Sequence, residues 1–258
     1  MKTRILSFIF VLFAASFALA QEGKTAGILL DQPAGRVPEL ESSFALEVSS
    51  QLNGVTVKPF FTQDADEKLQ VVAAGELPDT LWIHQGDEAD AVGPLYSPEW
   101  TEALQKYAEG ATAEKPRVVL LTGGAVRILK TMGYAEVSTP PLTVMNDRYQ
   151  VGLIPIDGGQ NALWNGLTSD RDIFWFTNAV YQAFDNCEIK PNDGTEVLLA
   201  GDVPGRPHTP LFVVKRGNCV FFVLPWYFSQ LYDYAADQFR VNTEILLANL
   251  LIGRKKEH

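Results

Sequence analysis

Apolar residues in the first half of the chain alternate between short continuous runs and helical spacing. The short runs are typical of buried strands and lie at residues 26–30, 55–61, 80–83 and 118–121. After each run, apolar residues recur every three or four positions, as on one face of a helix. These helical segments are residues 38–52, 64–75, 97–110 and 125–132. Repeated strand–helix units predict an α/β fold with a flavodoxin-like parallel sheet covered by helices on both faces.

Turn and cap residues support the predicted helices. Ser97 and Pro98 suit the N-cap and first position of one helix, and Gly110 suits its C-terminal end. Asp64 and Glu67 have the three-residue spacing of a capping box, which predicts a helix beginning at Asp64.

The second half has a different pattern, in which strand-like segments dominate. They lie at residues 144–153, 196–200, 211–215 and 219–224. The last two flank Arg216-Gly217-Asn218, a hairpin signal. A short helix is predicted for Asn178–Phe184, and a strong one for Phe239–Ile252. We therefore expect one domain over residues 21–258, with a β-rich extension and a C-terminal helix.

The N-terminus has the three parts of a secretory signal peptide. Lys2 and Arg4 are followed by an apolar stretch to Phe17 and by the small residues Ala18-Leu19-Ala20. The stretch is short for a membrane anchor, since a ~30 Å hydrocarbon core needs about 20 residues. We expect cleavage before Gln21 and export to the periplasm or the extracellular space.

Charge excludes two classes of partner. The full chain has a formal net charge of −10. Loss of the leader removes Lys2 and Arg4 and makes the net charge more negative. Nucleic acids and anionic membranes both require clustered Lys and Arg. We expect neither partner, and no membrane insertion after cleavage.

The two cysteines, Cys187 and Cys219, leave two alternatives open. In an oxidising compartment they can form a disulfide, or they can be separate buried thiols. Cys219 begins an apolar run, which favours burial. No Cys/His cluster has metal-ligand spacing, and we expect neither a metal nor a cofactor.

The turn Leu121-Thr122-Gly123-Gly124-Ala125 joins the fourth strand directly to a helix. Class I glutamine amidotransferase-like domains carry their nucleophilic Cys on such a turn. The chain resembles that superfamily and, within it, the trehalose-utilisation family. The segments that carry the resemblance are 79–87, 118–124, 164–167 with 176–181, and 210–225. The resemblance implies a carbohydrate-related role.

The chain departs from the family pattern at three places. Gly123 stands where the nucleophile is expected, and neither Cys is nearby. Asn178-Ala179 replaces an acidic pair, and Pro225-Trp226 replaces a late Gly-His. Glutaminase chemistry needs an activated thiolate, so these departures imply that this activity is lost or rebuilt.

The candidate site lies where four loops converge at the carboxyl edge of the sheet. His84 is a candidate general base with Asp87 as its partner. Gly123 and Gly124 offer backbone amides to a ligand, and Trp226 offers a ring for stacking on a sugar. The other candidate binding residues are Asp31, Gln85, Thr122, Asn178 and Tyr181.

Three functions are compatible with these residues. The first is an exported amidotransferase-like domain that binds or processes a carbohydrate-derived small molecule. The second is a catalytically inactive module that acts through a protein partner, which the missing Cys favours. The third is a hydrolase with Asp31 and Asp87 as paired carboxylates, which requires the two groups to lie about 5–10 Å apart.

Overall fold

The computed structural model describes most of the chain after residue 23. The described residues are 24–36, 40–86, 93–138, 143–144, 151–159, 162–177, 182–183, 187–202, 210–226 and 237–252. The predicted signal peptide and the basic residues after Gly253 lie outside these ranges. Within them, no helix is both long and apolar enough to cross a membrane.

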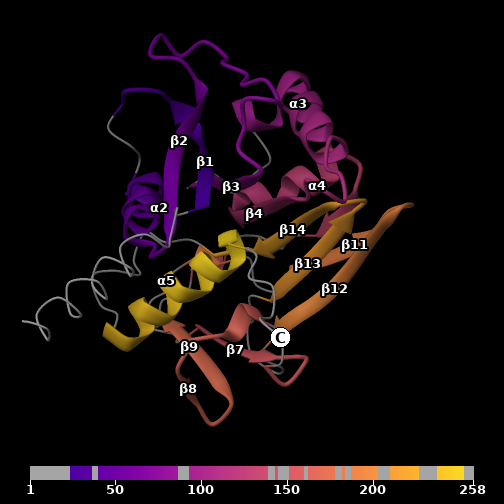
Figure 1. Cartoon of the computed structure of the whole chain (residues 1–258). Coiled ribbons are helices and arrows are strands. Elements are labelled where there is room, and N and C mark those ends of the chain that lie inside the picture. The colour runs from indigo at the N-terminus through magenta and orange to yellow at the C-terminus, as the bar shows by residue number, and fades with distance from the viewer. Residues whose placement is uncertain are drawn as a thin grey trace, which may run out of the picture.

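A ten-stranded sheet forms the centre of the molecule (Figure 1). Its strand order is β2-β1-β3-β4-β14-β13-β12-β7-β9-β8. The bounds are β1 Lys24–Pro33, β2 Val55–Gln63, β3 Thr80–Gln85, β4 Arg117–Gly123, β7 Val151–Pro155, β8 Ser169–Asp170, β9 Ile173–Thr177, β12 Thr195–Asp202, β13 Leu211–Arg216 and β14 Cys219–Leu224. The strands from β2 to β14 are parallel, and every later pair is antiparallel.

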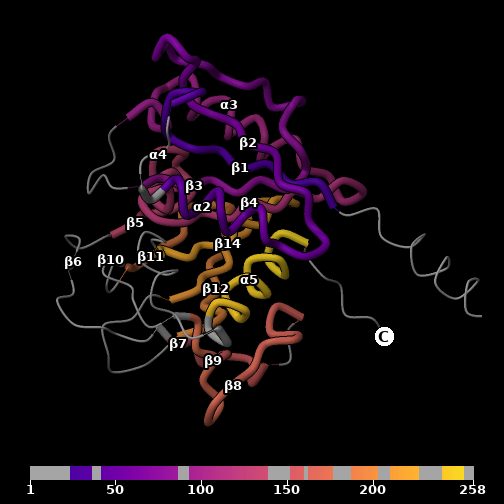
Figure 2. The backbone as a smooth tube through the Cα atoms, turned by 90° about the vertical axis from the view of Figure 1, so that its left-hand side faces the viewer, coloured from indigo at the N-terminus to yellow at the C-terminus, as the bar shows by residue number. Residues whose placement is uncertain are grey.

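The predicted fold class is therefore confirmed, and the β-rich second half continues the same sheet. The parallel strands β1 and β2 lie at one end of the molecule, and β7, β8 and β9 lie at the other (Figures 1 and 2). Two small sheets accompany the large one. They pair β6 Thr143–Val144 with β10 Gln182–Ala183, and β5 Ala135–Ser138 with β11 Glu188–Pro191.

Helices cover both faces of the sheet. One face, the α5 face, packs against α2 Leu40–Gln51, α5 Asp237–Ile252 and the short turn η3 Ala162–Trp164. The other, the α3 face, packs against η1 Pro94–Tyr96, α3 Pro98–Glu109, η2 Gly124–Arg127 and α4 Ile128–Thr131. Strand side chains alternate between the two cores: in β1, Ile28 and Leu30 face one core and Leu29 the other.

The helix α3 begins and ends as the sequence predicts. The Ser97 side chain accepts a hydrogen bond from the backbone N–H of Trp100, and Pro98 occupies the first helical position. Trp100, Leu104 and Tyr107 are buried on its inner face. Gly110 is the C-cap.

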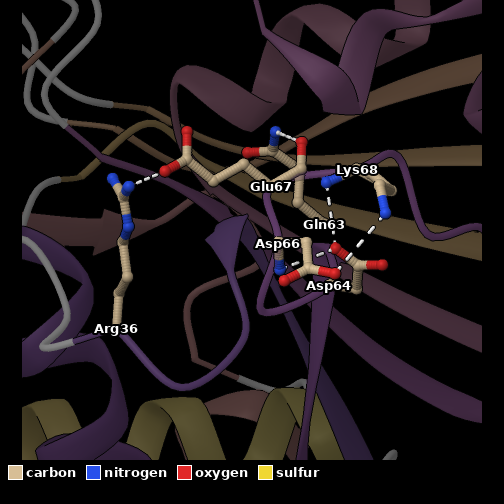
Figure 3. A network of polar contacts seen from close by, with 6 residues as sticks. All are labelled: Arg36, Gln63, Asp64, Asp66, Glu67 and Lys68. Atoms are coloured by element: carbon tan, nitrogen blue, oxygen red, sulfur yellow. Dashed lines mark hydrogen bonds and ion pairs between the residues drawn. The ribbon is translucent and has the colours of Figure 1, made fainter.

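The prediction of a helix from Asp64 to Gly75 is wrong. The Asp64 carboxylate accepts hydrogen bonds from the backbone N–H groups of Asp66 and Lys68, both at 2.9 Å, and so closes a turn (Figure 3). Glu67 has a φ of 64°, which ends any right-handed helix there, and its side chain pairs with Arg36. Of the expected apolar stripe, Leu69 is 42 % exposed, whereas Val72 packs against the core of the α3 face.

Three other predicted elements also differ. Gln182 and Ala183 form β10 instead of part of a helix over Asn178–Phe184, whose other residues lie outside the described ranges. The strand predicted over Val144–Leu153 begins in β6 and ends in β7, with residues 145–150 between them outside the described part. The helix predicted for Ala125–Met132 is divided into the 3₁₀ turn η2 and the single turn α4.

Candidate functional site

The candidate site lies where the order of the strands reverses. The chain passes from β1 outward to β2 and then crosses back, so that β3 pairs with the other side of β1. Ligands of open α/β sheets bind at such a switch point, beyond the carboxyl ends of the strands. Here β1 brings Asp31, β3 brings His84 and Gln85, and β4 brings Thr122 and Gly123 to this edge.

Asp31 is held by donors from three different elements. Its Oδ1 accepts hydrogen bonds from the Thr62 hydroxyl and the Leu95 backbone N–H, both at 2.9 Å. Its Oδ2 accepts one from the Gln85 side-chain amide at 3.3 Å. A Cβ at Gly93, where φ is +107°, would lie 2.7 Å from Oδ2. Because Gly93 has no side chain, its backbone can lie against this carboxylate. The hydrogen bonds hold the carboxylate in position.

Gln85 links Asp31 to the turn after β4. The Tyr96 hydroxyl lies 2.6 Å from Gln85 Oε1 and 2.7 Å from the Gly124 carbonyl oxygen, and it can donate to either. A Cβ at Gly124 would lie 2.3 Å from Gln85 Oε1. Only glycine fits at position 124 without displacing the buried Gln85 side chain.

His84 is fully buried and lies beside Thr122. Its Nδ1 is 2.8 Å from Thr122 Oγ1, which also accepts the indole N–H of Trp82 at 2.8 Å. Burial lowers the pKa of His84 from 6.5 to about 3. The imidazole is therefore neutral at physiological pH and is too weak a base for efficient proton abstraction there.

Gly123 forms a sharp turn between β4 and η2. Its φ of 58° and ψ of −139° lie in a region that is open mainly to glycine. Hydrolases of the strand–turn–helix type place their nucleophile on a strained turn of this kind. Position 123 offers no side chain, and the neighbouring Thr122 hydroxyl is buried between Trp82 and His84.

The cysteines are two separate buried thiols, and the disulfide alternative is wrong. Both belong to the core of the α3 face, at the start of β14 and just before β11. Burial raises the pKa of each thiol to about 12. Neither forms an activated thiolate in this environment.

The expectation that Trp226 presents its ring to a cleft for sugar stacking is wrong. Its side chain is fully buried in the core of the α5 face, with its ring centroid 5.1 Å from that of Phe176. The bond from its backbone N–H to the Leu224 carbonyl turns the chain inward immediately after β14.

The remaining predicted site residues lie outside the described ranges. They are Asp87, Asn178 and Tyr181, so the pairing of His84 or Asp31 with Asp87 stays a prediction. No group of three or more potential metal ligands occurs among the residues that the structure describes.

Two residues at this edge were missed by the sequence analysis. Tyr96 lies in a short 3₁₀ turn before α3 and bridges Gln85 and Gly124. Gln32 follows Asp31 at the end of β1 and is buried. The sequence did contain a signal for Gln32. It directly follows Asp31 after an apolar strand, so both residues must lie at the same edge of the sheet.

Comparison with known proteins supports the fold. No protein-family model and no curated protein sequence matches the chain. A ThuA-like protein of Parabacteroides merdae has a similar structure, with a TM-score of 0.53 and 9% identity over 92% of this chain and 93% of that one. The protein SMU.1228c has a TM-score of 0.52 and 12% identity over 88% and 99%.

A further similar structure is that of PurLQS from Thermotoga maritima. Its TM-score is 0.49, with 13% identity over 90% of this chain and 100% of that one. The likeness to the ThuA-like protein agrees with the flavodoxin-like α/β fold expected from the sequence. At these identities it concerns the fold alone.

Proposed function

We propose that this chain is an exported amidotransferase-like domain that has no glutaminase activity and binds a small, carbohydrate-derived molecule at the carboxyl edge of its sheet. The proposed lack of glutaminase activity rests on the residue at position 123, which is glycine. The sharp turn that would present a nucleophile is there, but the residue has no side chain.

No other described group supplies the missing nucleophile. The Thr122 hydroxyl is buried and bonded, and both thiols lie in the core of the α3 face with strongly raised pKa values. The depressed pKa of His84 removes the base that would activate a nucleophile. These features favour binding over hydrolysis at this site.

The binding part of the proposal rests on the switch point. Asp31 and Gln85 are fixed there by hydrogen bonds from several elements, so the edge is preorganised. Preorganised polar groups reduce the entropic cost of binding. Export rests on the leader sequence, and the carbohydrate class on the family resemblance.

A thermal-shift screen of residues 21–258 tests the binding part. The panel contains sugars, keto-sugars, amino acids and divalent metal ions. A ligand at 100 times its Kd stabilises by about 2.7 kcal/mol, a shift of several degrees. We expect a sugar to stabilise the wild type, and the shift to be lost in Gly124→Ala, whose Cβ would displace Gln85.

Gly75→Ala is the matched control, because no atom lies within 4 Å of a Cβ at that position. It should keep the ligand-induced shift. Ammonia release from glutamine tests the other part: we expect none from the wild type. Hydrolysis of glutamine by the wild type would overturn the proposed loss of activity.

A protein partner is the second candidate, and one observation favours it. Residues 195–199 of β12 pair only with β13 within the described part of the chain, because β7 reaches only Gly201 and Asp202. Leu198 and Leu199 on this strand are 43 % and 38 % exposed. Exposed apolar edge strands are common docking sites for another strand. A screen without a small-molecule hit would favour this candidate.

A further inference from the structure

Gln32 carries a buried side-chain amide that has no hydrogen-bond partner among the residues that the structure describes. The residue is 5 % exposed, and neither Nε2 nor Oε1 has a partner within the part of the chain that the structure describes. Native proteins satisfy most buried polar atoms, so a donor and an acceptor left open on one side chain require an explanation.

The place of Gln32 in the fold supplies one. In the β1–β3 ladder, Leu30 is opposite His84, so Gln32 lies beyond the paired residues at the switch point. The register between β1 and β2 shifts between Leu30 and Pro33, which marks a bulge at Asp31 and Gln32. Bulges are frequent next to binding sites, where they redirect side chains.

Two neighbouring polar side chains at this edge, Asp31 and Gln85, are tied into the fold by hydrogen bonds. Asp31 accepts three hydrogen bonds, and the Gln85 amide contacts both Asp31 and Tyr96. Two buried glutamines thus lie at the ends of adjacent strands. The Gln85 amide is hydrogen-bonded to its neighbours, whereas the Gln32 amide has no partner among the described residues. The difference indicates that the Gln32 amide serves something other than the fold.

We propose that Gln32 recognises the bound ligand, and that the group it contacts is uncharged and both donates and accepts hydrogen bonds. This inference rests on the small-molecule site proposed above and names its chemistry. Hydroxyl groups and carboxamides have this character. The open Nε2 hydrogens require an acceptor, and the open Oε1 requires a donor.

Charged groups fit this position poorly. A carboxylate could not donate a hydrogen bond to Oε1. An ammonium group would leave the Nε2 donors without an acceptor. His84 is neutral and supplies no positive charge that would offset an anion. Burial of an unpaired ion is costly, so a neutral ligand group is favoured.

The first test compares the stability of ligand-free Gln32→Met with that of Gln85→Met. Methionine has a similar size and no amide. If Gln32 serves the ligand, its replacement leaves the urea midpoint at or above the wild-type value, because an open donor and acceptor are removed. Gln85→Met should lower the midpoint, since it removes a hydrogen-bond donor to the Asp31 carboxylate and an acceptor for the Tyr96 hydroxyl.

The second test measures binding of two probes by calorimetry: D-glucose as the hydroxyl source and acetamide as the carboxamide source. We expect one of them to bind the wild type, and Gln32→Met to weaken that probe at least tenfold. Gln51→Met, on α2, is the control and should bind the probe as the wild type does. The probe that binds identifies which of the two sources the site uses.

Several results would overturn the inference. One is a midpoint for Gln32→Met that falls as far as that of Gln85→Met, which would make the amide structural. Others are equal probe binding by Gln32→Met and the wild type, or no binding of either probe. Glutamine hydrolysis by the wild type would instead overturn the proposed function and leave the stability comparison standing.

Discussion

The buried imidazole of His84 shows how one side chain limits the chemistry of the site. It lies in β3, between β1 and β4, and its Nδ1 is 2.8 Å from Thr122 Oγ1. Burial lowers its pKa to about 3, so the ring is neutral at physiological pH. The same burial makes the stability of the fold sensitive to acid.

The pH dependence has a definite sign. The unfolded chain binds a proton at His84 below pH 6.5, whereas the native state does so only near pH 3. The contribution of neutral His84 is therefore complete above pH 6.5 and is lost as the pH falls toward 3, by up to about 1.4 kcal/mol per unit. Urea unfolding at pH 7 and pH 5 should show a larger loss for the wild type than for His84→Gln, by up to about 2 kcal/mol. Equal losses would contradict this account.

Residue positions were predictable where local chemistry decides them, and not elsewhere. Gly123 and Gly124 were placed correctly at the strand–helix turn, because two glycines after an apolar run have few other uses. Trp226 was misjudged, since its burial depends on Phe176, fifty residues earlier. Tyr96 was missed because its hydrogen bond to the Gly124 carbonyl joins residues that are 28 positions apart in the sequence.

The helix α5 holds the loops of the second half in place through two asparagines on one side. Asn242 Nδ2 donates to the carbonyls of Thr168 and Trp175, and its Oδ1 accepts from the Thr168 N–H. Asn249 Nδ2 donates to the carbonyls of Leu163 and Asn165. Both asparagine side chains are buried.

Removal of one such side chain should be costly. Asn242→Ala leaves three backbone groups of the β8–β9 region without partners, and each buried unsatisfied group costs about 1–3 kcal/mol. We expect the free energy of unfolding in urea to fall by about 2–4 kcal/mol. Asn53→Ala, at an exposed position, is the control and should change it by less than about 0.5 kcal/mol. Similar values for the two variants would show that the asparagine bonds are weak.

The elements divide by the kind of signal that specifies them. Three signals predict α3, namely the N-cap Ser97, Pro98 at the first helical position and a buried apolar stripe, and the structure contains this helix. Asp64 and Glu67 have the right spacing for a cap, but the local backbone bonds of the Asp64 carboxylate close a turn instead. Side-chain bonds of this kind compete with helix formation, and the sequence spacing is the same in both cases. Short strands such as β10 depend on partners far away in the chain.

The two cores of the molecule differ in chemistry. The core of the α3 face contains both cysteines, Tyr107 and Tyr134, whereas that of the α5 face is built mainly from aliphatic residues, tryptophans and phenylalanines. The thiols are therefore reached only when this core opens. Their reactivity reports on the unfolding of the sheet as a whole.

Thiol labelling tests this arrangement. At pH 8 and without denaturant, a disulfide reagent should label neither Cys187 nor Cys219, because both are buried and their thiols stay protonated. In denaturant without reductant it should label two thiols per chain, and reductant should not change the Tm. Fewer than two thiols under those conditions would restore the disulfide alternative.

The ammonium group of Lys24 donates a hydrogen bond of 2.9 Å to the carbonyl oxygen of Ile252, the last residue of α5. The first described strand, which lies inside the sheet, thus meets the end of the last described helix. In topological terms this part of the chain is nearly a closed ring. A circular permutant that joins these ends by a short linker and opens at the exposed Gly217 turn would keep the contacts of both cores.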